Sequence, residues 1–101
     1  MNREQDKIVI RILDMEGNRL SETERFLRNS LKARNLHAVI HCVGCGLEIA
    51  RSGFSGMTPA LTMNGYTVSA GDALTQNVID MFCDKLLVWL DKRKEIEVAG
   101  G

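Results

Sequence analysis

The sequence predicts one α/β domain with a four-stranded mixed sheet and helices on both faces of the sheet. First, a β-branched run, an amphipathic helix and a second β-branched run follow one another within residues 7–42. This succession is typical of a parallel, right-handed βαβ unit. Second, Asn64-Gly65 separates two short strand-like runs, the strongest short-range signal of a hairpin. Third, a long amphipathic helix pattern follows the hairpin, giving the order β-α-β-α-β-β-α.

The composition excludes several classes of protein. The 101 residues carry 13 basic and 13 acidic side chains, so no overall charge indicates a nucleic-acid or membrane partner. No apolar run is long enough to span a bilayer, the N-terminus has no secretory pattern, and three cysteines do not suggest a disulfide framework. We expect a cytoplasmic protein with a domain at 7–94, between a disordered tail at 1–6 and a tail at 95–101. Neither a phosphate-binding glycine loop nor a nucleophile elbow is present, and no cofactor is expected.

The first predicted strand, residues 7–14, is apolar on both faces. Ile8, Ile10 and Ile12 alternate with Val9 and Leu13, which is typical of a central strand that is covered on both sides. Residues 15–20 read as a loop, and residues 36–42 as the second strand.

The first helix is predicted to begin at a capping box formed by Ser21 and Glu24, and to run to about Arg34. Asn35 suits the helix stop. Three basic side chains gather on the side away from the apolar residues: Arg25, Arg28 and Lys32. A solvated helix face is the simpler interpretation of this basic stripe, and a surface for an acidic partner is the alternative.

The second half contains a short helix at 47–52, strands on either side of Asn64-Gly65, and a last helix. Pro59 has no N–H to donate, so it is expected at or before the start of the strand 60–63. Asp72 or Thr75 is expected to cap the last helix, which should continue to about Lys94. Its apolar arc is wider than one sheet face needs, so either a neighbouring element or a second copy in a homodimer would cover the surplus.

The hairpin region carries a family resemblance. Met57-Thr58-Pro59-Ala60, then residues 61–65 and 68–71, resemble the proline-led hairpin of the thioredoxin fold, most of all that of its small glutaredoxin-sized members. The resemblance covers about residues 7–89. It implies that Pro59 is a cis-proline, and that the Thr58 backbone pairs with an extended peptide or a thiol ligand.

The chain departs from this family at the reactive dithiol. The family's CxxC lies at the N-terminus of the first helix, where the helix dipole lowers the thiol pKa. Gly17 and Leu20 stand at those two positions here. Nearby Asp14 and Glu16 would repel a thiolate, or are simply solvated in a loop. The sequence therefore predicts a non-catalytic module that binds a protein or peptide.

The predicted binding surface consists of Thr58, Pro59 and Gly17. The alternative is an atypical thiol–disulfide oxidoreductase or thiol redox sensor, in which one of Cys42 and Cys45 attacks and the other resolves. These two cysteines could equally be unreactive small residues in a turn. Cys83 lies on the apolar arc of the last helix and is expected in the core.

A metal site is the third alternative. His37 and His41 lie four apart in the predicted second strand and should point to the same face, close to Cys42 and Cys45. Residues 41 and 42 would point to opposite faces, and no second ligand pair follows elsewhere. We therefore assign no metal ligands.

Overall fold

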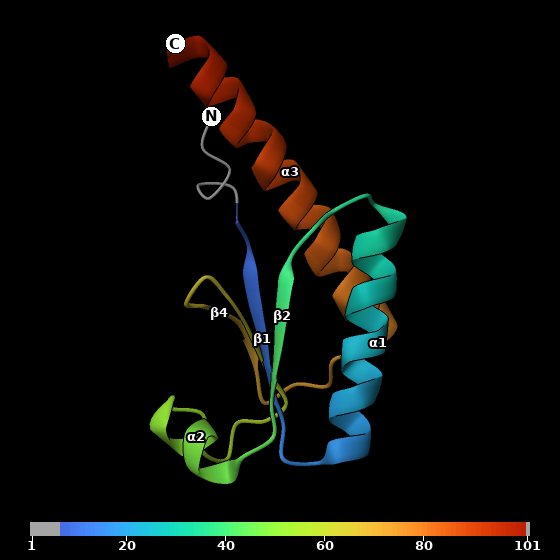
Figure 1. Ribbon diagram of the computed structural model, residues 1–101, viewed down its shortest axis with the longest axis vertical. Helices are drawn as coiled ribbons and strands as arrows, with labels where there is room; N and C mark the ends of the chain where they lie inside the picture. The colour runs from blue at the N-terminus through green and yellow to red at the C-terminus, as the bar shows by residue number, and fades with distance from the viewer. Residues whose placement is uncertain (1–6, 101) are drawn as a thin grey trace.

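The computed structural model describes residues 7–100, with side chains to residue 92. It contains one open four-stranded mixed sheet and three helices (Figure 1). The predicted order of elements is confirmed. In chain order they are β1 (Val9–Leu13), α1 (Gly17–Ala33), β2 (Val39–Val43), α2 (Gly46–Arg51), β3 (Ala60–Met63), β4 (Tyr66–Ala70) and α3 (Gln76–Gly100).

The strands lie in the order β2-β1-β3-β4. β1 and β2 are parallel, as a βαβ unit requires, with Ile12 opposite Cys42. β3 is antiparallel both to β1 and to β4. The apolar segment around residues 8–13 is therefore a central strand, as its two apolar faces predicted.

The sheet has helices on both faces, but they cover the two faces unequally. α1 and α3 pack side by side on one face, which buries Ile10, Ile12, Leu27, Leu61 and Ile79 almost completely (Figure 1). α2 contributes Ile49 to a smaller cluster with Leu13, Val43 and Ala60. The burial of these apolar side chains is the main source of stability.

The turn residues behave as the sequence predicts. Asn64 and Gly65 both have positive φ, +49° and +87°, which a type I′ hairpin requires. Asn35 has φ +54°, and the Leu36 N–H bonds back to the Leu31 carbonyl at 2.9 Å, which ends α1. The Thr75 hydroxyl accepts from the Val78 N–H at the start of α3, so Thr75 is the cap.

The predicted start of the first helix was wrong. α1 begins at Gly17, and its N-cap is Glu16, whose carboxylate accepts from the Arg19 N–H at 2.7 Å. Ser21 is therefore inside the helix, and Glu24 pairs with Arg28 at 2.7 Å instead of closing a capping box. The predicted capping box does not form because Asp14, at the end of β1, already holds the first turn of the helix in place through the Glu16 N–H and the Arg19 side chain.

The last helix is longer than predicted. α3 continues to Gly100, beyond the expected end near Lys94, so most of the predicted C-terminal tail is helical. The tail predicted at 1–6 lies outside the described residues.

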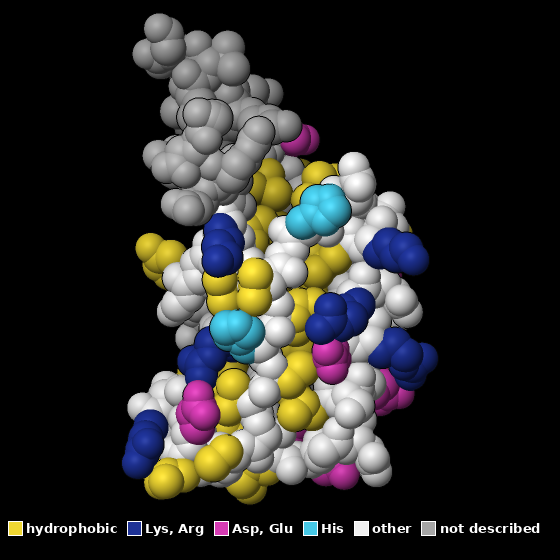
Figure 2. Space-filling view, viewed as in Figure 1, with side chains coloured by type: hydrophobic (Ala, Val, Ile, Leu, Met, Phe, Trp, Pro, Cys, Tyr) yellow, Lys and Arg dark blue, Asp and Glu magenta, His cyan; other side chains and the backbone are white. Residues whose placement is uncertain are grey.

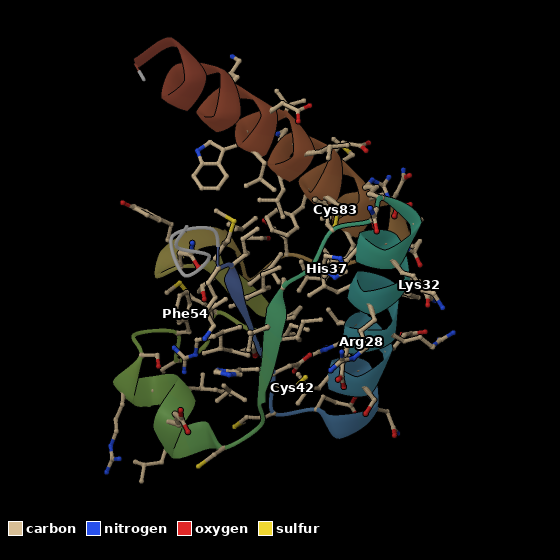
Figure 3. The ribbon with its side chains drawn as sticks, turned by 45° about the horizontal axis from the view of Figure 1, so that its top comes forward. Arg28, Lys32, His37, Cys42, Phe54 and Cys83 are labelled. Atoms are coloured by element: carbon tan, nitrogen blue, oxygen red, sulfur yellow. The ribbon has the colours of Figure 1, made fainter. Side chains whose placement is uncertain are left out.

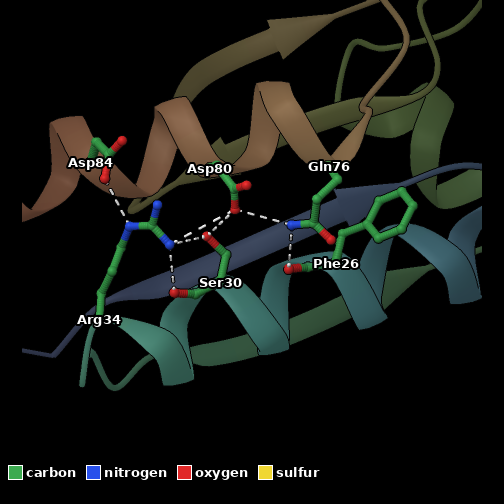
Figure 4. Close-up of polar contacts among 6 residues, drawn as sticks. All are labelled: Phe26, Ser30, Arg34, Gln76, Asp80 and Asp84. Carbon is green, nitrogen blue, oxygen red and sulfur yellow. Dashed lines mark hydrogen bonds and ion pairs between the residues drawn. The ribbon is translucent and has the colours of Figure 1, made fainter.

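A polar network joins α1 to α3 (Figure 4). The Ser30 hydroxyl donates to Asp80 at 2.7 Å, and Gln76 donates to the same carboxylate at 3.0 Å. Arg34 donates to Asp84 at 2.8 Å and to the Ser30 hydroxyl at 2.8 Å. These bonds hold the first half of α3 against α1, and Gln76 also lines the groove described next.

Candidate functional site: the groove beside cis-Pro59

The Thr58–Pro59 peptide bond is cis, as the resemblance implied. Pro59 is buried at the head of β3, and its carbonyl accepts from the Gly71 N–H at 3.0 Å. Within the described residues, neither the N–H nor the carbonyl of Thr58 makes a hydrogen bond. Backbone groups next to a cavity that lack a protein partner are available to a ligand.

A cavity of about 530 Å³ lies beside this segment. Three parts of the chain line it: α1, the cis-proline segment, and the turn from β4 into α3. Its walls combine apolar and polar side chains, which is common in binding clefts. The residues that line it include Arg19, Glu22 and Phe26 from α1, Leu74 from the turn, and Gln76 from the start of α3.

An ion pair below the groove fixes the start of α1. The Asp14 side chain is 1% exposed and accepts from Arg19 Nε at 2.5 Å and Nη2 at 2.8 Å. It also accepts from the Glu16 N–H at 3.1 Å. The Arg19 hydrogen bonds, opposed by burial and helped by the Glu16 N–H, lower the pKa of Asp14 below its ordinary 3.8. Asp14 is therefore a structural anchor and not a solvated loop residue.

Gly17 does not line this cavity. It is exposed at the first position of α1, and among the described residues no atom outside its chain neighbours and its own helix backbone lies within 4 Å of where its Cβ would be. Met57 lies closer to the cis-proline segment than Gly17 does, because it directly precedes Thr58 and its Cα lies close to Gly71. Its side chain is apolar and 42% exposed. Of the three predicted contacts, the structure brings Thr58 and Pro59 together in the groove.

The three cysteines lie in different environments and are not bonded to one another. Cys83 is buried in the core, as predicted. Cys45 is exposed at the N-cap of α2. Cys42 is on β2, with β1 between it and β3, and partial burial together with the neighbouring carboxylate of Glu24 raises the pKa of its thiol above the ordinary 9.0.

This environment gives a prediction for thiol reactivity. At pH 7 Cys42 should react slowly with iodoacetamide, because only the thiolate attacks and its pKa is raised. Glu24→Gln should speed alkylation of Cys42 by roughly threefold or more, because removal of the negative charge favours the thiolate. Mass spectrometry of timed samples between pH 6 and 10 would measure both rates. Glu22→Gln, two residues earlier on the same helix, is the control, because residues two apart point to different sides of a helix. Equal acceleration by both variants would contradict this account.

The two histidines do not share a face, contrary to the prediction. β2 begins only at Val39, so His37 precedes the strand and lies with Asn35 and Leu36 beside α1. His41 pairs in register with Arg11, whose side chain reaches Glu48 of α2 at 3.3 Å on the other face. Among the residues that the structure describes, no group of three or more metal-ligating side chains is close enough to hold an ion.

Sequence reasoning missed Arg19, Phe26 and Gln76 as groove residues. Phe26 is one of several apolar positions on its helix, and Gln76 is a polar residue at the start of the last helix, so neither position stands out in the sequence. The spacing of Asp14 and Arg19 was the only local signal, and it became meaningful only once the helix was known to begin at Gly17.

Comparisons with protein-family models, with curated proteins and with solved structures found no match to this chain. In the described part of the chain, no helix combines the length and apolar character needed to cross a membrane.

Association of two copies through α3 stays a prediction. Met81 and Val88 lie on the outward side of that helix, and both are more than half exposed.

Proposed function

We propose that this protein is a non-catalytic binding module that holds an extended segment of a protein partner in the groove beside cis-Pro59. The observation that carries the proposal is the Thr58 backbone, whose N–H and carbonyl have no partner within the described residues and adjoin the cavity. An extended peptide offers one carbonyl and one N–H that could pair with these two groups.

The fold supports the same proposal. The strand order β2-β1-β3-β4, with a cis-proline at the head of β3, is compatible with a thioredoxin-like domain. The two positions that would hold the dithiol are Gly17 and Leu20, so the first turn of α1 has no thiol to exchange. Thiol chemistry at Cys42 and Cys45 is the alternative; the raised pKa of Cys42 does not favour it.

The apolar side chains around the groove indicate the kind of segment that would fit. Phe26, Leu74 and Pro59 provide apolar contacts, while Arg19 and Glu22 provide charge at one end. We expect the bound segment to combine one or two apolar side chains with polar flanks. Binding of such short segments is usually weak, with Kd of about 1–100 μM, corresponding to roughly 5–8 kcal/mol.

A selection experiment tests this proposal. A phage library of random heptapeptides is selected on the immobilised chain, and the enriched peptides are synthesised and measured by fluorescence anisotropy. Ala73→Trp, which places an indole at the wall of the cavity, should weaken binding by about tenfold or more. Ala50→Trp, on the exposed side of α2, is the matched control. No enriched peptide, or peptides that bind both variants equally well, would contradict the proposal.

A further inference from the structure

The outer edge of β2 is a second surface with unused backbone groups. β2 is the first strand in the sheet order, and no strand among the described residues pairs with its outer side. The Val39 N–H donates to the Ile8 carbonyl at 2.8 Å, and the Val43 carbonyl accepts from the Asp14 N–H at 3.0 Å. In a parallel ladder this register turns the peptide groups of Ile40 and Cys42 outward. Such an edge is a template for one more strand.

A groove runs beside this edge. A cavity of about 270 Å³ lies between β2, the turn that precedes it, and the second half of α1. Its floor is apolar, made by Leu31, Leu36, Ala38 and Ile40. Figure 2 looks onto this side of the molecule and shows hydrophobic side chains exposed along β2, with Lys and Arg side chains on the α1 side.

The rim of this groove is positively charged. Arg28 and Lys32 of α1 are the cations that line it, together with His37 from the segment before β2, and Figure 3 labels all three. Arg28 already donates to Glu24, at 2.9 and 2.7 Å. Lys32 has no ion-pair partner within the described residues, so positive charge remains in excess along the groove although the whole chain is neutral.

We propose that the β2 edge binds an acidic, extended segment of a partner protein, which adds to the sheet as a fifth strand. Alternate side chains of an added strand point to one face of the sheet. Those on the α1 face would enter the groove, where apolar ones meet Ile40 and carboxylates meet Lys32 and His37. The backbone hydrogen bonds of the edge do not depend on the sequence of the bound segment, whereas the side chains of the groove give the preference for acidic residues.

Two other occupants fit less well. A second copy joined edge to edge by antiparallel β2 strands, about a two-fold axis perpendicular to the sheet, would bring both α1 helices to the same face of the joined sheet. Arg28 and Lys32 of one copy would then approach those of the other. A polynucleotide would satisfy the cations but has no peptide groups to pair with Ile40 and Cys42.

The test uses a blocked heptapeptide in which glutamate and valine alternate at the odd-numbered positions and threonine fills the even ones, so that acidic and apolar side chains lie on one face of the strand. It is titrated into the ¹⁵N-labelled chain and followed by NMR. The amides of Ile40 and Cys42 should shift and saturate. Lys32→Glu should weaken binding by about tenfold or more, because it replaces attraction by repulsion. Lys85→Glu makes the same charge change on the exposed side of α3 and should leave the affinity within about twofold. Ala73→Trp should have no effect, so this proposal and the one for the cis-Pro59 groove can fail separately.

A second measurement isolates the backbone pairing. The same peptide is N-methylated at alternate residues in two versions, so that either one edge or the other edge of the bound strand loses its N–H groups. One version should lose binding and the other should retain it. The proposal is overturned by no shift at millimolar peptide, by equal binding of a lysine–valine peptide, or by equal loss or retention in both methylated versions. Tighter binding of an oligouridylate, or a dimer in sedimentation experiments that buries this edge, would overturn it as well.

Discussion

Replacing Arg19 with methionine is expected to lower the free energy of unfolding by about 2–4 kcal/mol at pH 7, because it leaves a buried carboxylate without its main partner. Asp14 is 1% exposed and would keep only the Glu16 N–H at 3.1 Å. This loss is smaller than is usual when one partner of a fully buried ion pair is removed, because Arg19 is half exposed and solvent screens part of its attraction to Asp14.

The same variant should change the pH dependence of stability. In the native protein the pKa of Asp14 is lowered, so its contribution is fully present above the unfolded value, near 3.8, and is lost as the pH falls through the folded pKa. Without the guanidinium, burial raises that pKa. The difference between wild type and Arg19→Met should therefore be largest above about pH 5 and shrink in acid.

Urea unfolding followed by circular dichroism at pH 7, 5, 4 and 3 measures both effects. Arg25→Met is the matched control on the same helix, since Arg25 is 65% exposed and lies 3.8 Å from Glu22. It should change the stability by less than about 0.5 kcal/mol. If the two variants are equally stable at pH 7, Asp14 and Arg19 do not anchor the start of α1.

Leu61→Ala should lower the free energy of unfolding by about 3–4 kcal/mol, because it opens a cavity in the largest part of the core. Leu61 has no exposed surface, and it lies on β3 two residues after Pro59, within the core cluster formed with α1 and α3. Neighbouring side chains held by the sheet and by the Ser30–Asp80 bond cannot relax fully into the space.

The control for this prediction is the same substitution at an exposed site. Leu47 on α2 is 61% exposed, so Leu47→Ala should change the stability by less than about 0.5 kcal/mol. Thermal and urea unfolding of both variants would measure the difference. A loss below about 1 kcal/mol for Leu61→Ala would mean that the core between the sheet and the two helices is not packed as described.

Much of the fold could be predicted because its signals are local. Alternating Ile8, Ile10 and Ile12 indicate a strand whatever the rest of the chain does. Asn64-Gly65 and Asn35 tolerate positive φ, so they mark a turn and a helix end on their own. The βαβ unit and the hairpin predict the parallel pairing of β1 with β2 and the antiparallel pairing of β3 with β4, but these local signals do not place β3 beside β1.

The errors arose where distant groups compete with a local motif. Ser21 and Glu24 have the spacing of a capping box, but Asp14 holds Glu16 and Arg19 and starts the helix earlier. The spacing of His37 and His41 suggested a shared face, but β2 begins only after His37. In both cases the outcome depends on where an element begins.

The sequence by itself determined the elements, their order along the chain and the buried face of the first strand, because periodicity and turn chemistry are properties of short segments. Only the tertiary structure decided what surrounds each polar group. Within the described residues it left the Thr58 peptide groups without a partner beside a cavity, it buried Asp14 under Arg19, and it placed Lys32 on the same cavity as Ile40 of β2. These juxtapositions join residues from different elements, and the physical reason for them is the packing of helices on a sheet, which no single segment specifies.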